Sequence, residues 1–336
     1  MYIGVGNKAK NISSIYVGVG VKAKNVVKGY VGVSGKAKLF FNPVTPPPMV
    51  SFSAATDQEV IDILDAHYNG VIDIGDYWSV GDVRQASSSK PLFQVNAHTS
   101  LRTFDGSYYR TTYSMPKQST IKWQIIGINH DTLTTSINGY NKAAITIQTV
   151  GLLSIYENNY SNWAGTMSMN NSDTTLNSWK GCQLRKYLTG WASNTTLNSD
   201  GSGNFYNACN FKSLIKKVNK STNTGHGSGN NTSLETTNDY VFLLSEWEIF
   251  GKKNYSVGNE GCTQYTYWAN HNTDNDRIKK LGWEGASGAA CDWWERSPKS
   301  GYSHSFCYVG NGGGANNGNA YDYASSHCGV APACCL

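Results

Sequence analysis

The first 41 residues repeat one short pattern three times. The copies run from Tyr2 to Lys10, from Tyr16 to Lys24 and from Tyr30 to Lys38, so their tyrosines recur every 14 residues. Each copy has a β-prone run, a glycine-containing turn and a second short run, which predicts a β-hairpin. Because one hairpin of this size is marginally stable alone, the three should stack on one another, on copies from other chains or on a larger particle. We expect a docking or oligomerisation module; a plain soluble β-meander is the alternative.

A proline-rich segment follows the repeat and marks a domain boundary. Three consecutive prolines, Pro46 to Pro48, form a semi-rigid spacer. Beyond it, Thr56 and Glu59 have the spacing of a capping box, so a short helix is expected that ends at Gly70. The expected organisation is a repeat module over residues 1–41, a linker over residues 42–50 and one domain over residues 51–336.

The domain is expected to combine strands and helices. Apolar runs predict strands at residues 121–128 and 144–150, and helical spacing of apolar residues predicts helices over residues 178–190 and 211–218. Lys220 would then lie on the solvated side of the second helix.

Polar segments separate these elements. Residues 219–239 are interpreted as a loop too hydrophilic to pack. His130 and Asp131 are adjacent in a turn, where such pairs usually make local hydrogen bonds, and no nucleophile motif accompanies them. We therefore expect no catalytic role for this pair.

The positive charge of the chain is concentrated in the repeat. The chain has 28 basic and 23 acidic residues, and residues 1–41 hold seven lysines and no acidic residue. The remainder therefore has 21 basic against 23 acidic residues, a net charge of −2. A nucleic-acid binder needs a basic surface, which the larger part of the chain lacks, so we expect no nucleic-acid partner.

Other function classes lack sequence support as well. No apolar run approaches the ~18 residues of a membrane span, and no secretory segment follows Met1. We expect synthesis in the cytoplasm and no membrane insertion. The eight cysteines form no C-x-x-C pair and no zinc spacing with the seven histidines. No metal or cofactor is therefore expected, and the cysteines are interpreted as buried small hydrophobic residues.

The last stretch of the chain has apolar ends and a polar middle. Trp293 and Trp294 open it, and the closing residues 329–336 are small and apolar, typical of a buried strand. Between them, Ser300 to Cys328 contains no Lys, Glu, Gln, Met or Trp. Tyr with Ser, Gly and Asn is typical of adaptable binding surfaces, because Tyr offers a large contact area at little entropic cost.

Five segments together resemble a known family. They are residues 179–188, 241–249, 260–261, 293–298 and 329–333. In this order they resemble a domain of unknown function that is common in proteins of gut bacteria and their prophages. The resemblance runs from about Phe52 to Leu336 and implies an α+β fold of the C-type-lectin-like (formylglycine-generating-enzyme-like) class. The repeat resembles a segment often found ahead of that domain in phage tail-associated proteins.

The same fold is used by variable proteins of diversity-generating retroelements. Their mutable positions are typically AAC or AAT codons altered at the adenines, and every residue from Ser300 to Cys328 can be encoded by such a codon. The resemblance implies a candidate variable region over residues 299–328. Whether this region varies is an open question at this point.

The resemblance implies a receptor-binding protein of a virion tail. Its partners would be a host cell-surface protein or glycan and, through residues 1–41, other tail proteins; a homo-oligomer is expected, with a trimer favoured. The expected ligand-binding residues are Tyr302, His304, Tyr308, Asn311, Asn316, Asn317, Asn319, Tyr321, Asp322, Tyr323, Ser326 and His327. The expected framing residues are Trp293, Trp294, Arg296, Pro298, Gly329 and Pro332, with Glu295 and Arg296 as a buried ion pair.

Two alternatives remain. One is a structural virion component without a ligand, in which the C-terminal segment packs against a neighbour. The other is a lectin-fold or cell-wall-acting enzyme, but no pair of carboxylates is singled out for glycoside hydrolysis. Related formylglycine-generating enzymes need reactive cysteines, whereas Cys307, Cys334 and Cys335 adjoin apolar strand residues that leave a thiol inert. We expect a binding protein and not an enzyme.

Overall fold

The computed structural model describes most of the framework of the chain. It covers residues 45–87, 120–153, 178–192, 214–224, 233–282, 288–302, 305–319 and 328–336, the six strands of the repeat and short pieces around residues 101, 108, 118 and 169. The chain forms two compact units, one of residues 1–78 with 137–140 and one of residues 79–136 with 141–336.

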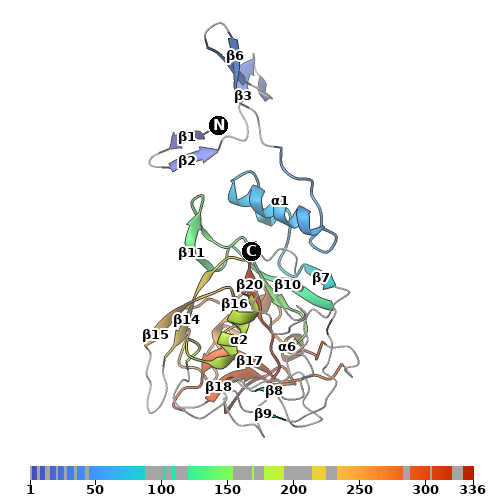
Figure 1. Cartoon of the computed structure of the whole chain (residues 1–336), viewed down its shortest axis with the longest axis vertical. Helices are drawn as coiled ribbons and strands as arrows, with labels where there is room; N and C mark the ends of the chain where they lie inside the picture. The colour runs from blue at the N-terminus through green and yellow to red at the C-terminus, as the bar shows by residue number, and fades with distance from the viewer. Residues whose placement is uncertain are drawn as a thin grey trace. The chain divides into compact units, whose positions relative to one another are not determined.

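Each repeat of the first unit forms its own antiparallel hairpin (Figure 1). The hairpins are three separate two-stranded sheets, and each joins the first run of a repeat to the second. Their strands are β1 (Tyr2–Val5) and β2 (Lys8–Asn11), β3 (Tyr16–Val19) and β4 (Lys22–Asn25), and β5 (Gly29–Val33) and β6 (Lys36–Phe41).

Helix α1 (Asp57–Tyr68) follows the linker. Its capping box is formed, because Thr56 accepts from the Glu59 amide and the Glu59 side chain accepts from the Thr56 amide. Val60 and Leu64 are buried. The helix is capped at Asn69, and Gly70 then has a left-handed φ of 69°. The short helix η1 (Ile74–Asp76) completes the described helices of this unit.

The core of the second unit is a five-stranded antiparallel sheet. Its strand order is β16 (Val241–Phe242), β20 (Ala333–Cys335), β13 (Ile145–Thr149), β10 (Thr120–Ile128) and β7 (Val83–Ser87). Every residue of β13 is buried, as its continuous apolar and Thr/Gln sequence between two neighbours requires. The two predicted strands at residues 121–128 and 144–150 correspond to β10 and β13.

A second sheet corrects two predictions. It contains β12 (Tyr140–Lys142), β11 (Thr132–Ile137), β14 (Val218–Asn223) and β15 (Leu234–Asp239) in this order. The helix predicted over residues 211–218 is wrong at its end, because Lys216 bridges Cys335 and Val218 starts β14. The polar loop predicted over residues 219–239 is wrong as well: its two ends pair as β14 and β15.

The third sheet holds the last stretch of the chain. It has the order β17 (Trp293–Pro298), β18 (Ser305–Val309) and β19 (Ala315–Asn319). A further small sheet pairs β8 (Leu101–Arg102) with β9 (Tyr108–Tyr109). The described helices of this unit include α2 (Gln183–Ala192), α4 (Glu246–Phe250), α5 (Thr266–Asn270) and α6 (Asp274–Arg277).

The fold is therefore a mixed one, with a few helices and many antiparallel strands. Helix α2 overlaps the segment predicted as helical over residues 178–190, although it begins at Gln183 and ends at Ala192, and its Leu184 and Leu188 are buried. In the part of the chain that the structure describes, no helix has both the length and the apolar character to cross a membrane.

Candidate binding surface

The two ends of the last stretch are buried and joined to each other. All six residues of β17, including Trp293, Trp294 and Pro298, are buried, as are Gly329 and Pro332. The Trp294 amide donates to the Gly329 carbonyl at 3.1 Å. A Cβ at Gly329 would lie 2.3 Å from Cδ1 of Leu152, so any other residue there would require the Leu152 side chain to move.

Between these ends, β18 and β19 form a hairpin with one buried and one accessible strand. In β18, Ser305, Phe306, Cys307 and Val309 are buried, whereas none of the described β19 residues is. The turn is closed by the Gly313 amide, which donates to the Gly310 carbonyl at 2.7 Å. A buried strand therefore carries an accessible polar strand.

Tyr302, before β18, and Tyr308, on β18, are the two predicted contact tyrosines that the structure describes. Tyr302 is 50% exposed, and the Lys299 ammonium lies 3.5 Å from its ring centroid. Tyr308 is half-buried and pairs across the strands with Asn316, so both point to the same face of the sheet. The Tyr308 ring also meets Trp294 edge to face, at 5.8 Å between centroids, which fixes the tyrosine on the framework.

The remaining predicted contacts are only partly described. Asn311 and Asn316 are exposed, Asn317 is half-buried, and the Asn311 amide donates to the Asp292 carboxylate at 2.6 Å. Asn319 ends β19, and its side chain lies outside the described residues. Also outside the described residues are His304, Tyr321, Asp322, Tyr323, Ser326 and His327.

A chain of buried charges runs from β17 to Asp131, the residue before β11. Arg296 makes a bidentate pair with Glu248, at 2.5 Å and 3.1 Å, and Lys220 bridges Glu248 at 2.8 Å and Asp131 at 2.6 Å. All four side chains are at most 4% exposed. The prediction that Arg296 pairs with Glu295 was wrong, because Glu248, fixed by the capping box of α4, takes the guanidinium. The solvated position predicted for Lys220 was also wrong.

These contacts keep the network ionised. Burial by itself raises the pKa of Glu248, but the Arg296 and Lys220 charges outweigh it and bring that pKa to about 2. Burial likewise opposes ionisation of Asp131, yet Lys220 and the neighbouring His130 hold its pKa well below the usual range. Two cations thus balance two carboxylates.

Asp131 bonds to residues far away in the sequence. Its carboxylate accepts from Thr146 at 2.5 Å and from the Tyr265 hydroxyl at 2.8 Å, in addition to Lys220. The prediction of local hydrogen bonds at the His130–Asp131 turn therefore misses the main role of Asp131.

A polar pocket of about 410 Å³ lies over this network. Its only cysteine is Cys262, whose pKa is raised to about 12, mainly by burial, so the thiol is protonated at neutral pH. The pocket offers hydrogen bonds and matched charges rather than an activated nucleophile. Its lining is His130, Asp131, Thr132, Lys142, Asn219, Lys220, Ser221, Thr236, Glu248, Gly261, Cys262 and Thr263.

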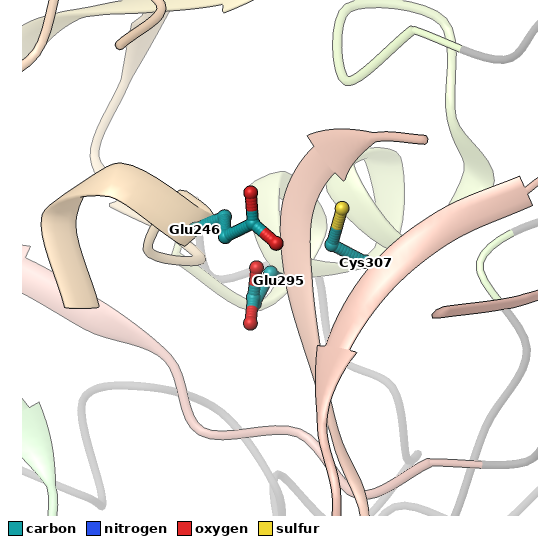
Figure 2. Close-up of side chains that lie close together, drawn as sticks. All are labelled: Glu246, Glu295 and Cys307. Atoms are coloured by element: carbon teal, nitrogen blue, oxygen red, sulfur yellow. The ribbon is translucent and has the colours of Figure 1, made fainter. Parts of the chain in front are cut away.

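The cysteines in the described part of the chain are free thiols. Cys182, Cys307, Cys328, Cys334 and Cys335 are buried, and Cys262 and Cys291 are half-buried. One of them, Cys307, lies beside the carboxylates of Glu246 and Glu295, so these three side chains could hold a metal ion (Figure 2). Sequence reasoning missed this group because its members are far apart in the chain and form no spaced motif.

A family model described as a domain of unknown function (DUF6273) matches residues 164–336. The chain belongs to this family. The DUF6273 segment contains Lys220, Glu248 and Arg296 of the charge network and the whole third sheet, whereas Asp131 precedes it. The match is shorter than the expected coverage from about Phe52. No curated protein and no solved structure matches the chain.

Proposed function

We propose that the chain is a tail-associated binding protein of a phage or prophage. Its DUF6273 domain, with a C-type-lectin-like fold, presents Ser300 to His327 to a host cell-surface protein or glycan. Residues 1–41 dock the protein on other tail components or on copies of itself, within the virion.

One observation carries this proposal: the accessible strand β19 and its turn are mounted on the buried strands β17 and β18. Asn311 and Asn316 are exposed while the strand that supports them is packed against the core. Neutral polar side chains on a rigid framework lose little entropy when a ligand binds, which favours recognition. The edge-to-face contact of Tyr308 with Trp294 provides an anchor of the same kind.

The charge network supports a binding role, because its carboxylates are not suited to act as a general acid or base. Its carboxylates are held ionised by cations, and the nearby thiol of Cys262 is protonated. A general acid or base needs a pKa near the working pH and access to substrate, which Asp131 and Glu248 do not combine. The network instead fixes β11, β14, α4 and β17 to one another.

Binding can be tested with charged substitutions on the exposed hairpin. The variant Asn311→Arg/Asn316→Arg adds two long cationic side chains to the proposed contact face. We expect labelled protein to adsorb to susceptible gut bacterial cells about ten-fold more weakly than the wild type, because such side chains obstruct a neutral polar contact.

The matched control is Asn219→Arg, which adds the same side chain to an exposed position of β14 at the polar pocket. It should adsorb like the wild type. A folded double variant with unchanged adsorption, or a loss confined to the Asn219 variant, would contradict the assignment of the surface. Thermal unfolding of each variant checks that it is folded.

Variation of the segment is a separate question with its own test. We propose that residues 299–328 form the variable region of a diversity-generating system. Sequencing the gene from many isolates should find substitutions concentrated there while Trp293, Trp294 and Gly329 stay fixed. An equally constant segment would favour the structural role instead.

A further inference from the structure

We propose that Glu246, Glu295 and Cys307 bind a divalent metal ion, with zinc as the best match. The site lies inside the domain, between the first turn of α4, the middle of β17 and the middle of β18 (Figure 2). Cys307 belongs to the segment Ser300–His327, but its side chain is buried and is not one of the expected contact residues, and the site does not depend on the proposed function.

The three side chains converge and are fully enclosed. One donor atom from each, a carboxylate oxygen of Glu246 and of Glu295 and the sulfur of Cys307, lies within 4.8 Å of the other two. All three residues have no exposed surface. Tetrahedral zinc with bonds of about 2.0–2.3 Å holds its ligand atoms about 3.5 Å apart, so the group needs only a small contraction.

The carboxylate of Glu295 is buried without a hydrogen-bond partner among the described residues, which points to a bound ligand. This holds for both of its carboxylate oxygens. Buried carboxylates in native proteins are bonded, paired or bound to a metal. A proton shared with Glu246 would satisfy one oxygen of Glu295 and leave the other with only the weak donor of a thiol.

A metal ion would satisfy the whole group. One carboxylate oxygen of Glu246, one of Glu295 and the Cys307 thiolate provide three protein ligands, and the second Glu295 oxygen can complete the coordination of four typical of zinc. Two carboxylates and a thiolate carry three negative charges, so a dication leaves one. The positive charges of Arg277 and Arg296 act on Glu295 and offset part of that remaining charge.

Glu246 is already oriented for coordination. Its Oε2 accepts from the amides of Asn254 and Ser256 and from the Ser256 hydroxyl, at 2.6–2.9 Å. Among the described residues, its Oε1 accepts one hydrogen bond, from the Tyr255 amide at 2.8 Å. Oε1 therefore keeps a lone pair for the metal. Outer hydrogen bonds of this kind fix the orientation of a ligating carboxylate.

The donor set selects among metals. Calcium and magnesium prefer oxygen ligands only, whereas a thiolate with two carboxylates suits a borderline-soft ion such as zinc. Cobalt(II) occupies the same geometry and gives an intense near-ultraviolet absorption when a thiolate is bound, so it reports directly on Cys307.

The test is the metal content of the full chain. Wild-type protein refolded with zinc and then dialysed should retain about one zinc per chain, and with cobalt(II) it should show the thiolate absorption. Cys307→Ser should lose the cobalt absorption. Glu295→Gln should lose the metal but stay folded, because its amide can donate to Glu246 as a shared proton would.

The control is Cys182→Ser, which removes another fully buried thiol of the domain. It should keep both the zinc and the cobalt absorption. The proposal is overturned if folded wild type retains less than about a tenth of a zinc per chain, or if Cys307→Ser keeps the thiolate absorption. The first result would assign a shared proton to the Glu246–Glu295 pair.

Discussion

At the scale of single residues, Lys220 carries a positive charge that is almost fully buried. Its ammonium group is buried between two carboxylates and within 3.1 Å of the Tyr265 hydroxyl. Burial by itself lowers the pKa of Lys220, but Asp131 and Glu248 raise it above its ordinary value, so the amine stays charged. A buried ion pair adds little net stability when complete, yet breaking it leaves an uncompensated charge.

The substitution Lys220→Met tests this. We expect the free energy of unfolding to fall by about 3–5 kcal/mol, because Asp131 loses its bonded cation while Glu248 keeps Arg296. Urea denaturation measures the loss. The control Lys217→Met removes an exposed lysine of the same segment, 5.1 Å from the Tyr240 ring centroid, and should change stability by less than about 1 kcal/mol. Similar losses in both variants would contradict the structural role of Lys220.

Glu260 makes stability depend on pH. Its carboxyl group accepts from the Asn223 amide and the Ser297 hydroxyl, and burial raises its pKa from the ordinary 4.5 to about 7. The folded state therefore binds a proton between these pH values that the unfolded state has released. Stability from this group is complete below pH 4.5 and is lost as the pH rises to about 7, by at most about 1.4 kcal/mol per pH unit.

Glu260→Gln should remove this decline, because an amide does not titrate. The measurement is the free energy of unfolding of wild type and variant at several pH values from 4 to about 8. The expected result is a difference between the two proteins that changes across this range in favour of the variant at higher pH. A constant difference would show that Glu260 titrates alike in both states.

At the scale of elements, the turn between β18 and β19 depends on one glycine. Gly313 has a left-handed φ of 87°, and a Cβ there would lie 1.7 Å from the Asp274 carbonyl oxygen of α6. Gly312, next to it, has open space around a Cβ. The backbone of the proposed contact hairpin therefore packs closely against α6 at Gly313, where a side chain has no room.

Gly313→Ala should therefore destabilise the protein by about 2 kcal/mol or more, through strain and overlap with α6. Gly312→Ala should stay within about 0.5 kcal/mol of the wild type. Both are measured by urea denaturation. If the two alanine variants were equally stable, the turn would not pack against Asp274 as described.

The elements also show how far sequence patterns reach. Helix α1 was predictable because its start is a local capping box, and β10 and β13 because they are apolar runs. The sequence pattern did not predict strand β14, because Val218 is the only apolar residue among its buried positions and the others are Lys220, Thr222 and Asn223. Their buried polar groups are satisfied by residues from other elements, which no local pattern encodes.

At the scale of the whole molecule, the same limit applies to the sites. Composition singled out the polar middle of the last stretch, and its described part includes the exposed residues Tyr302, Asn311 and Asn316. The charge network was not predictable, because Asp131, Lys220, Glu248 and Arg296 meet only when β11, β14, α4 and β17 come together. The group of Glu246, Glu295 and Cys307 could not be predicted from the sequence for the same reason.

The repeat module allows one prediction about the whole assembly. Its three hairpins are separate two-stranded sheets, so each leaves two strand edges without a partner strand among the described strands of the repeat. Isolated hairpins are marginally stable in water, and free edges invite pairing with other chains. The seven lysines within residues 1–41 repel one another between associating chains. Salt screens this repulsion, so association should strengthen as the ionic strength rises.

We therefore expect the full chain to be a trimer that strengthens with salt, and a chain lacking residues 1–41 to be a folded monomer. Analytical ultracentrifugation at low and moderate salt measures both masses. Circular dichroism melting checks that the shortened chain keeps the fold of the second unit, whose core lies in the five-stranded sheet. A trimer that persists without residues 1–41 would show that the oligomer interface lies in the remaining chain. A full chain that stays monomeric at every salt concentration would contradict self-association through the hairpin edges.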